Sequence, residues 1–292
     1  MTARLKGSPK TRETAPDADR APLARLRRRR ILLQLACLAI TGFMALPMYL
    51  ITLAAFSSRD ALERFPKNFL PTDVSTETLH SFLGATGVVP SFLNSVVVGL
   101  LTLVLSLAIG TPAGYAIARH VFRGRDAYQL FLLFTRALPI VVLSVPLTEM
   151  FITAGMSDTI AAVALLHTAF AVPTTVLITA SIFTAVPRDV EEAALVFGCT
   201  PFMAFRRVVA PLALPGIAAS SVFTFILSWN EVLGAAVLTL TNRTLPAQVL
   251  ASLQDSPLAY RFVGGFALVL PALVFVFLMR RYLVNMWGTT LR

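Results

Sequence analysis

Long uninterrupted runs of hydrophobic residues, separated by shorter polar segments, dominate the pattern along this chain of 292 residues. Six of these runs are long enough to cross the roughly 30 Å hydrocarbon layer of a membrane, which takes about 20 residues of helix. They lie approximately at 31–56, 91–118, 127–152, 159–185, 215–240 and 262–279. Because an unpaired backbone group is costly in lipid, each run is expected to be helical. The pattern therefore predicts an all-α polytopic membrane protein with six transmembrane helices.

The composition agrees with this fold class and argues against a soluble enzyme. Hydrophobic residues make up 56% of the chain and charged residues only 14%, against roughly 25% charged in ordinary globular proteins. Only the third and fifth runs contain charged residues, namely Arg136, Glu149 and Glu231. The first run, 31–56, is longer than the apolar core of a secretory signal, which spans about 7–15 residues. It is therefore expected to remain as a membrane anchor.

The basic residues predict the orientation of the chain rather than a nucleic-acid partner. The net charge is +10, and ten of the 25 Lys and Arg residues lie within residues 1–30. If the N-terminus is inside, inner segments carry nineteen Lys and Arg residues and outer segments carry four. By the positive-inside rule, both termini are cytoplasmic in the cell membrane. Residues 1–30 are expected to form a disordered basic tail, and we expect contact with membrane lipid but not with nucleic acid.

The inner segment 186–214 is too polar to span a membrane, and its residues predict two short helices. Asp189 can serve as an N-cap with Glu192 three residues later, which is a capping-box arrangement. Gly198 can adopt the left-handed conformation that ends such a helix. Thr200 followed by Pro201 can then restart a helix. The segment is therefore predicted to bend at Gly198.

One face of this hairpin suits close approach by another surface. Ala193, Ala194 and Phe197 recur at spacings of three and four, which places them on one side of a helix. The alternative is an amphipathic hairpin that lies on the membrane, with Arg206 and Arg207 near lipid phosphates. The local physics favours neither interpretation over the other.

The order of residues in this segment resembles a known signature. Glu192-Ala193-Ala194 is followed after three residues by Gly198, and after nine more by Val208, with Ala210-Pro211 beyond. This order is similar to the EAA signature of permease subunits of ABC importers. The resemblance covers about residues 31–290 and implies the type I ABC-importer permease fold, in which the bent helix docks into the ATPase subunit. The residues it implies for ATPase coupling are Glu191, Glu192, Ala193, Ala194, Phe197, Gly198, Pro201 and Arg206.

Other short motifs resemble the carbohydrate branch of these importers. They are Asn94-Ser95, the run 113–119 (Ala-Gly-Tyr-Ala-Ile-Ala-Arg) and the run 228–231 (Ser-Trp-Asn-Glu). More narrowly, the chain resembles the second permease of maltose-type systems. That resemblance implies a heterodimer with a different permease, an ATPase dimer that binds ATP and Mg, and an extracytoplasmic sugar-binding protein.

Nucleotide hydrolysis is not expected of this chain. A phosphate-binding loop requires a Gly-Lys pair, and the only lysines, Lys6, Lys10 and Lys67, do not follow a glycine. Cys37 and Cys199 offer neither a disulfide framework nor a cluster of metal ligands. We therefore expect a non-enzymatic transport subunit that itself binds no metal or cofactor.

Polar residues inside the predicted spans are candidates for the substrate pathway, because charge at membrane depth is costly unless it faces a wet or polar interior. Trp229, Asn230 and Glu231 offer a stacking ring, an amide and a carboxylate for a sugar, although packing between helices would also explain Trp229 and Asn230. Arg136 could attract an anionic solute or form an interhelical ion pair, for example with Glu231. His167 is expected to be a satisfied helix-packing residue.

Three alternatives to a carbohydrate permease remain. One is a stand-alone secondary transporter coupled to ions through Arg136, Glu149 and Glu231, and another is an ABC importer of an anionic solute that carries a phosphate or a carboxylate. The third is a membrane scaffold or receptor without a transport path, which the charges inside the membrane disfavour. The outer segment 57–90 is long enough to fold as a small cap, and a plain tether would explain its composition almost as well.

Overall fold

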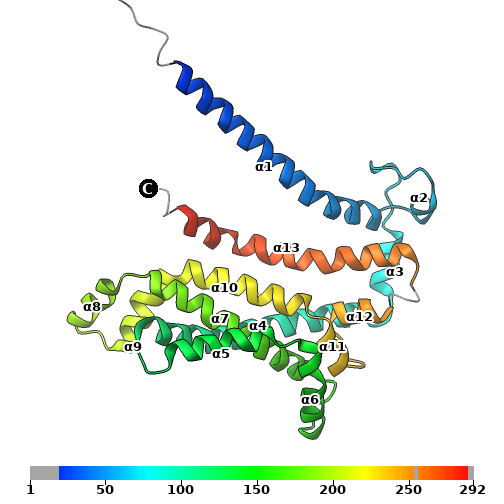
Figure 1. Ribbon diagram of the computed structural model, residues 1–292. Coiled ribbons are helices and arrows are strands. Elements are labelled where there is room, and N and C mark those ends of the chain that lie inside the picture. Colours follow the sequence, from blue (N-terminus) through cyan, green and yellow to red (C-terminus); the bar gives the residue numbers. More distant parts are fainter. Residues whose placement is uncertain (1–19, 253–255, 289–292) are drawn as a thin grey trace, which may run out of the picture. The chain divides into compact units, whose positions relative to one another are not determined.

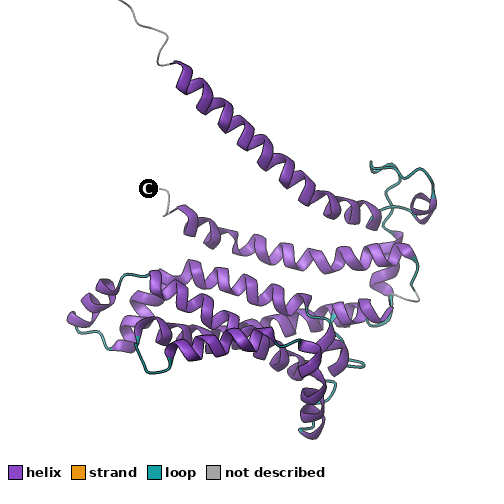
Figure 2. Cartoon of the chain, in the orientation of Figure 1, coloured by secondary structure: helices purple, strands orange, loops and turns teal. Residues whose placement is uncertain are grey.

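The computed structural model describes residues 20–252 and 256–288, and their side chains apart from those of 20–26, 141 and 283–288. Within these ranges the regular secondary structure is helical (Figures 1 and 2), and a single isolated bridge pairs Ser57 with Val74. The predicted all-α fold class is therefore confirmed. The chain divides into two compact units, Met1–Ile51 and Thr52–Arg292.

The first unit consists, in its described part, of most of helix α1, Arg20–Ala55. Residues 27–55 of this helix are long and apolar enough to cross a membrane, as predicted for 31–56. The expected disordered tail is only partly testable, because residues 1–19 lie outside the described residues. From Arg20 to Arg30 the prediction is wrong, since these residues continue the helix. Leu and Arg have high helix propensity, which offsets the local repulsion between neighbouring arginines.

In the second unit, four of the other five predicted spans correspond to long helices. Helix α4 is Val88–Arg119, α7 is Ile160–Ala185 and α13 is Leu258–Gly288. Each is long and apolar enough to cross a membrane, as is the continuous helical stretch Pro201–Asn230. Among the described residues, five helices meet this criterion, and the number is six if one bent helix pair counts as a single span. Five of the six predicted spans are therefore matched by helices of this kind, and the bent pair covers the remaining one.

The third predicted span, 127–152, is broken rather than continuous. Helix α5, Arg125–Ala137, and helix α6, Ile140–Thr153, meet at an angle of 91°. Leu138 is extended, with φ −72° and ψ 125°, and it directly precedes Pro139. Proline disfavours the helical conformation of the residue before it and lacks the N–H that would continue the helix. The break also places Arg136 in the last turn of α5.

The fifth span begins and ends earlier than predicted. Helix α9, Pro201–Ala204, continues through a π-helical turn, η1, Phe205–Val209, into α10, Ala210–Asn230. The predicted range 215–240 is therefore displaced, because the helix ends where Glu231 becomes extended. A separate short helix follows, α11, Leu233–Leu238, and the Glu231 carboxylate accepts hydrogen bonds from the N–H groups of Gly234 and Ala235.

Short helices occupy the connections that the charge pattern predicts to be outer. The segment 57–90 contains α2, Arg59–Glu63, and α3, Glu77–Gly84, before α4 begins. The isolated bridge and an ion pair of 3.8 Å between Arg64 and Asp73 close this segment on itself. It is folded, which favours the small cap over the plain tether. Helix α12, Leu245–Ser252, precedes the last span.

Close packing of α4 against α7 forms the centre of the second unit. A Cβ atom on Gly114 would come within 2.1 Å of Thr179 Oγ1, and one on Gly110 within 2.6 Å of Thr175 Cγ2. The Thr179 hydroxyl donates to Gly110 O at 2.9 Å. Small residues let membrane helices approach closely, and hydroxyls hydrogen-bond across the contact. These two helices therefore behave as one body.

Candidate functional site

The segment between α7 and α10 forms a bent hairpin, as predicted. Helix α8, Arg188–Val196, ends in a Schellman motif, in which Gly198 N donates to Leu195 O and Cys199 N donates to Ala194 O, both at 3.0 Å. Gly198 has φ +88°, a conformation that L residues with a Cβ adopt only at a cost. We call residues 186–209 the coupling hairpin. In Figure 1, α8 lies beyond the ends of α4, α7 and α10.

The predicted N-cap of α8 is wrong, whereas the predicted start of the second helix is confirmed. Pro187 occupies the cap position, and no side chain accepts a hydrogen bond there, so Asp189 lies in the first turn instead. Proline has its φ fixed near the value that a helix start requires. At the second start, Thr200 accepts from Met203 N at 3.3 Å and Pro201 follows at the first helical position. This second helix is not short, because it continues into α10.

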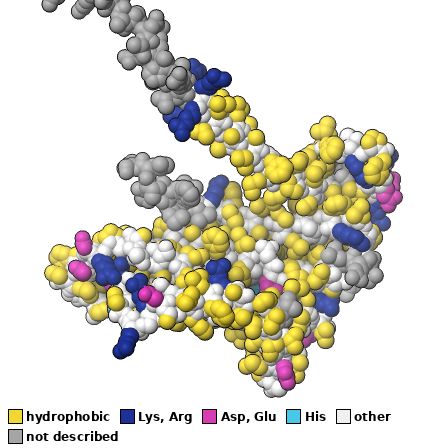
Figure 3. Space-filling model, viewed as in Figure 1, with side chains coloured by type: hydrophobic (Ala, Val, Ile, Leu, Met, Phe, Trp, Pro, Cys, Tyr) yellow, Lys and Arg dark blue, Asp and Glu magenta, His cyan; other side chains and the backbone are white. Residues whose placement is uncertain are grey.

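The end of the hairpin carries exposed apolar side chains. Val196, Phe197 and Phe202 are 85%, 89% and 70% exposed, and we call them the apolar tip. Charged side chains gather around the end of the bundle that carries α8 (Figure 3). Ala193, Ala194 and Phe197 were predicted to form one face, but only Ala193 and Phe197 are exposed, and Ala194 is buried. Exposed apolar side chains at such a position indicate a surface that another molecule covers.

The opposite side of α8 is attached to α4 by polar contacts. Arg119 Nε lies 2.8 Å from Glu191 Oε2, and these side chains are only 6% and 15% exposed. The Tyr115 hydroxyl donates to the other oxygen of Glu191. Glu191 therefore differs from Glu192, whose side chain is exposed. The run 113–119 is recognisable in the sequence, but no local pattern there predicts a role for Tyr115 or Arg119.

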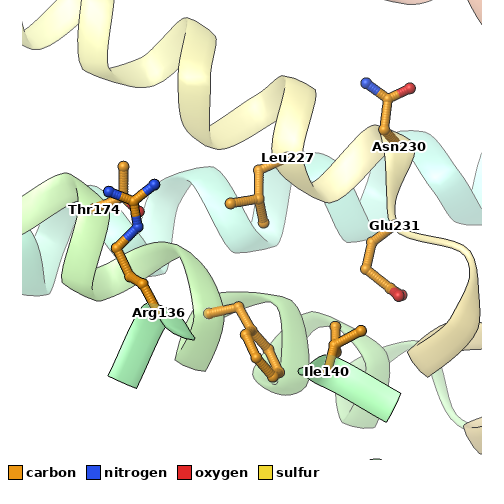
Figure 4. Close-up of a pocket in the computed structure, with 7 residues that line it drawn as sticks. Arg136, Ile140, Thr174, Leu227, Asn230 and Glu231 are labelled. Atoms are coloured by element: carbon orange, nitrogen blue, oxygen red, sulfur yellow. The ribbon is translucent and has the colours of Figure 1, made fainter. Parts of the chain in front are cut away.

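A cavity of about 270 Å³ lies beside the break of the third span. It is lined by Arg136, Ile140, Phe170, Thr174, Leu227, Asn230 and Glu231. Figure 4 shows Arg136 at the opposite end of the cavity from Asn230 and Glu231. Thr174 Oγ1 is buried and has no hydrogen-bond partner among the residues that the structure describes, and Phe170 offers an aromatic ring. The cavity thus combines a cation, a carboxylate, an amide, a hydroxyl and apolar walls.

Glu231 is paired with His167 rather than with Arg136. His167 Nε2 lies 3.0 Å from Glu231 Oε2, and His167 Nδ1 lies 2.9 Å from Ser228 Oγ. His167 is fully buried, so its prediction as a satisfied packing residue is confirmed. The suggested Arg136–Glu231 ion pair is not formed, and within the described residues Arg136 makes no ion pair.

Trp229 does not belong to the cavity. Its side chain is 1% exposed, and its indole N–H donates to Leu268 O on α13 at 2.8 Å. Its ring stacks on Phe225 at 5.8 Å and meets Phe92 edge-on at 6.1 Å. Successive helical residues point in directions about 100° apart, so Trp229 and Asn230 cannot share a face. Trp229 was predicted to supply the aromatic ring, but the ring that lines the cavity belongs to Phe170 on α7.

Asp158 joins the α6–α7 connection to the connection after α11. Its carboxylate accepts from the N–H groups of Leu240 at 2.9 Å and of Thr241 and Asn242 at 3.1 Å, and from the Thr241 hydroxyl. Asn242 Nδ2 donates back to Asp158 O at 2.8 Å. Burial raises the pKa of Asp158, but the hydrogen bonds lower it further, so the pKa lies below its usual value.

Comparison with known proteins identifies the family. Residues 110–285, more than half of the chain, match the family described as the binding-protein-dependent transport system inner membrane component. The chain belongs to this family. It is therefore a multi-pass membrane permease subunit of an ABC importer, and not the enzyme that hydrolyses nucleotide.

Two relatives and one solved structure illustrate the similarity. The trehalose transport system permease protein SugB of Mycobacterium tuberculosis is 32% identical over 66% of this chain and 73% of its own length. The sulfoquinovosyl glycerol transport system permease protein SmoH of Agrobacterium fabrum is 32% identical over 60% of this chain and 59% of its own length. A crystal structure of a bacterial ABC transporter involved in the import of the acidic polysaccharide alginate aligns with TM-score 0.67 and 21% identity, covering 88% of this chain and 97% of that one. This likeness supports the type I permease fold.

Proposed function

We propose that this permease forms half of the translocation pathway of an ATP-driven carbohydrate importer and that the coupling hairpin docks on a separate ATPase subunit. The observation that carries the proposal is the apolar tip, where Phe197 is 89% exposed although the other side of α8 is firmly attached. Exposed phenylalanines at the end of a rigid hairpin fit a hydrophobic cleft in a partner. The similar permeases are named for the transport of trehalose and of sulfoquinovosyl glycerol, which supports a carbohydrate as the substrate.

The same proposal specifies the partners and the orientation. The chain pairs with a second permease, an ATPase dimer that holds ATP and Mg, and an extracytoplasmic sugar-binding protein. Both termini and the hairpin face the cytoplasm, as nineteen inner against four outer basic residues predict. Closure of the ATPase dimer moves the hairpin, and the helices rearrange around a central pathway.

The cavity beside the broken third span is this subunit's contribution to the pathway. Sugars present hydroxyls and apolar ring faces, which match Asn230, Glu231 and the ring of Phe170. Arg136 belongs to this pathway because a charge at membrane depth costs about 2.5–3.5 kcal/mol unless it faces a polar interior. Since the structure pairs Trp229 with the backbone of α13, Trp229 is not included.

A charge reversal on the hairpin tests this function. Glu192→Lys is expected to abolish uptake of labelled trehalose and of other labelled disaccharides, while the amount of protein in the membrane stays normal. Asp126→Lys, an exposed reversal in the first turn of α5 and therefore also on the predicted cytoplasmic side, is the matched control and should transport normally.

Cross-linking of the hairpin to the ATPase subunit is the second part of this test. Phe197→Cys is expected to cross-link to a co-purifying ATPase when a short bifunctional thiol reagent is added. Uptake by Glu192→Lys at the wild-type rate, or purification of a transport-competent chain without an ATPase, would contradict the proposal. The second result would favour a stand-alone secondary transporter, a reading that family membership does not favour.

A further inference from the structure

One threonine of α7 lacks the hydrogen bond that the other threonines of this helix form. The hydroxyls of Thr168, Thr175, Thr179 and Thr184 each donate to the carbonyl oxygen four residues earlier, at 2.7–3.0 Å. Threonines within helices commonly satisfy their hydroxyls in this way. Thr174 Oγ1 is buried as well, but it makes no hydrogen bond with any residue that the structure describes. Its hydroxyl is therefore left for a partner of another kind.

The position of Thr174 indicates where this partner lies. Thr174 lines the cavity beside the break of the third span, and the other threonines of α7 do not. Figure 4 shows Thr174 toward the end of the cavity that carries Arg136. Thr175, by contrast, lies between helices, where its Oγ1 is 3.0 Å from Thr224 Oγ1 of α10. A buried hydroxyl without a partner is costly. We therefore expect the partner of Thr174 among the occupants of the cavity.

The other polar groups of the cavity differ from this hydroxyl in what they can bind. The Glu231 carboxylate accepts from two N–H groups at the start of α11, at 2.8 and 3.0 Å, and His167 Nε2 lies 3.0 Å from it. These contacts use three of its roughly four acceptor positions. The guanidinium of Arg136 can only donate, and Asn230 lies at the opposite end of the cavity. At the Arg136 end, the Thr174 hydroxyl can both donate to a sugar hydroxyl and accept from it.

We infer that Thr174 is a specificity-determining residue whose hydroxyl forms a direct hydrogen bond with one hydroxyl of the transported carbohydrate. The inference rests on the proposed function, because it assumes that a sugar passes through this cavity. With a volume of about 270 Å³, the cavity has room for water to pair with Thr174 when no sugar is present. A sugar hydroxyl that replaces this water keeps Thr174 paired. A sugar that lacks the hydroxyl leaves Thr174 unpaired and is therefore transported less well.

The first measurement tests whether Thr174 faces the pathway. It uses the complete transporter in lipid vesicles, with Cys37 and Cys199 replaced by Ser. Thr174→Cys should react with a hydrophilic thiol reagent, whatever the identity of the sugar. Thr175→Cys should not react, because this side chain is fully buried between helices. Absence of reaction at residue 174, both with and without ATP and vanadate, would overturn the inference.

The second measurement pairs the Thr174 hydroxyl with the hydroxyls of the sugar, one at a time. The probes are labelled trehalose, or whichever labelled disaccharide the parent takes up, and its monodeoxy analogues. In the parent, the loss of one particular sugar hydroxyl should lower the uptake rate by about 2-fold to 13-fold, the net effect of one hydrogen bond. In Thr174→Val this penalty should disappear, while the penalties for the other sugar hydroxyls persist. Thr174→Ser retains a hydroxyl and should retain the penalty.

A matched control separates this effect from general damage to α7. Thr168→Val also removes a buried hydroxyl from α7, but one that bonds within the helix and lies outside the cavity, so every penalty should stay as in the parent. The inference is wrong if Thr174→Val retains all the penalties of the parent, or if Thr168→Val removes the same one. Failure of the proposed function looks different, because the parent then takes up no labelled disaccharide and Phe197→Cys does not cross-link to an ATPase. In that case the assignment of Thr174 to a sugar hydroxyl fails with it.

Discussion

A substitution series at Gly198 tests whether the bend of the coupling hairpin is required for transport. Gly198 has φ +88°, and a Cβ added there would meet no atom within 4 Å. The cost of Gly198→Ala is therefore conformational only, about 1–2 kcal/mol for an L residue in the left-handed region. That cost shifts the equilibrium between the bent hairpin and other conformations by about 5-fold to 30-fold. Gly198→Asn should cost less, because asparagine tolerates this conformation better than most residues.

Proline at the same position should be far more damaging. It fixes φ near −65°, and it removes the N–H that donates to Leu195 O at 3.0 Å. The hairpin cannot keep the observed bend with both changes, and a cost of about 3 kcal/mol or more is expected. The predicted order of uptake rates is glycine, asparagine, alanine, proline, with proline abolishing uptake while the protein stays in the membrane.

The assay is uptake of a labelled disaccharide at equal amounts of membrane protein, together with cross-linking of Phe197→Cys to the ATPase. Gly124→Ala is the matched control, since Gly124 has φ +93°, also has no atom within 4 Å of an added Cβ, and lies between α4 and α5. It carries the same strain but should leave uptake nearly unchanged. If Gly198→Pro transports at the wild-type rate, or if Gly124→Ala reduces uptake as severely as Gly198→Ala, then the bend at Gly198 is not required for transport.

Three further predictions follow from other parts of the molecule. Gly114→Ala should destabilise the protein by about 1–3 kcal/mol through overpacking on Thr179, measured by thermal unfolding in detergent, whereas Gly84→Ala, with open space around it, should not destabilise it. The pKa of Asp158 is lowered in the folded state, so its ionised carboxylate should stabilise the fold at neutral pH, and this stabilisation should be lost as the pH falls through the usual pKa of aspartate to the lower folded-state pKa. Asp158→Asn should therefore make the melting temperature less dependent on acid pH. Arg136→Gln should reduce uptake of neutral and carboxylate-bearing disaccharides alike, and a selective loss of the anionic ones would assign an anion site to Arg136 instead.

The amino-acid sequence by itself determined the class of the fold and the bend of the hairpin. Hydrophobicity and length are local properties, so the spans were countable without tertiary information. The bend at Gly198 and the restart at Thr200-Pro201 were also predictable, because caps depend on residues close together in the chain. The order of residues from Glu192 to Pro211 indicated the family, and the family match over residues 110–285 bears out that prediction.

Tertiary structure alone decided which proline breaks a span and which charges meet. Pro112 and Pro173 lie inside continuous helices, whereas Pro139 lies at the 91° break. A proline removes one hydrogen bond in each case, and whether the helix continues depends on how neighbouring helices satisfy the freed groups. Likewise, Glu191 pairs with Arg119, 72 residues away in the chain, and no local pattern specifies a contact between such distant residues. Local sequence sets conformation, but the choice among partners is made only when the helices pack.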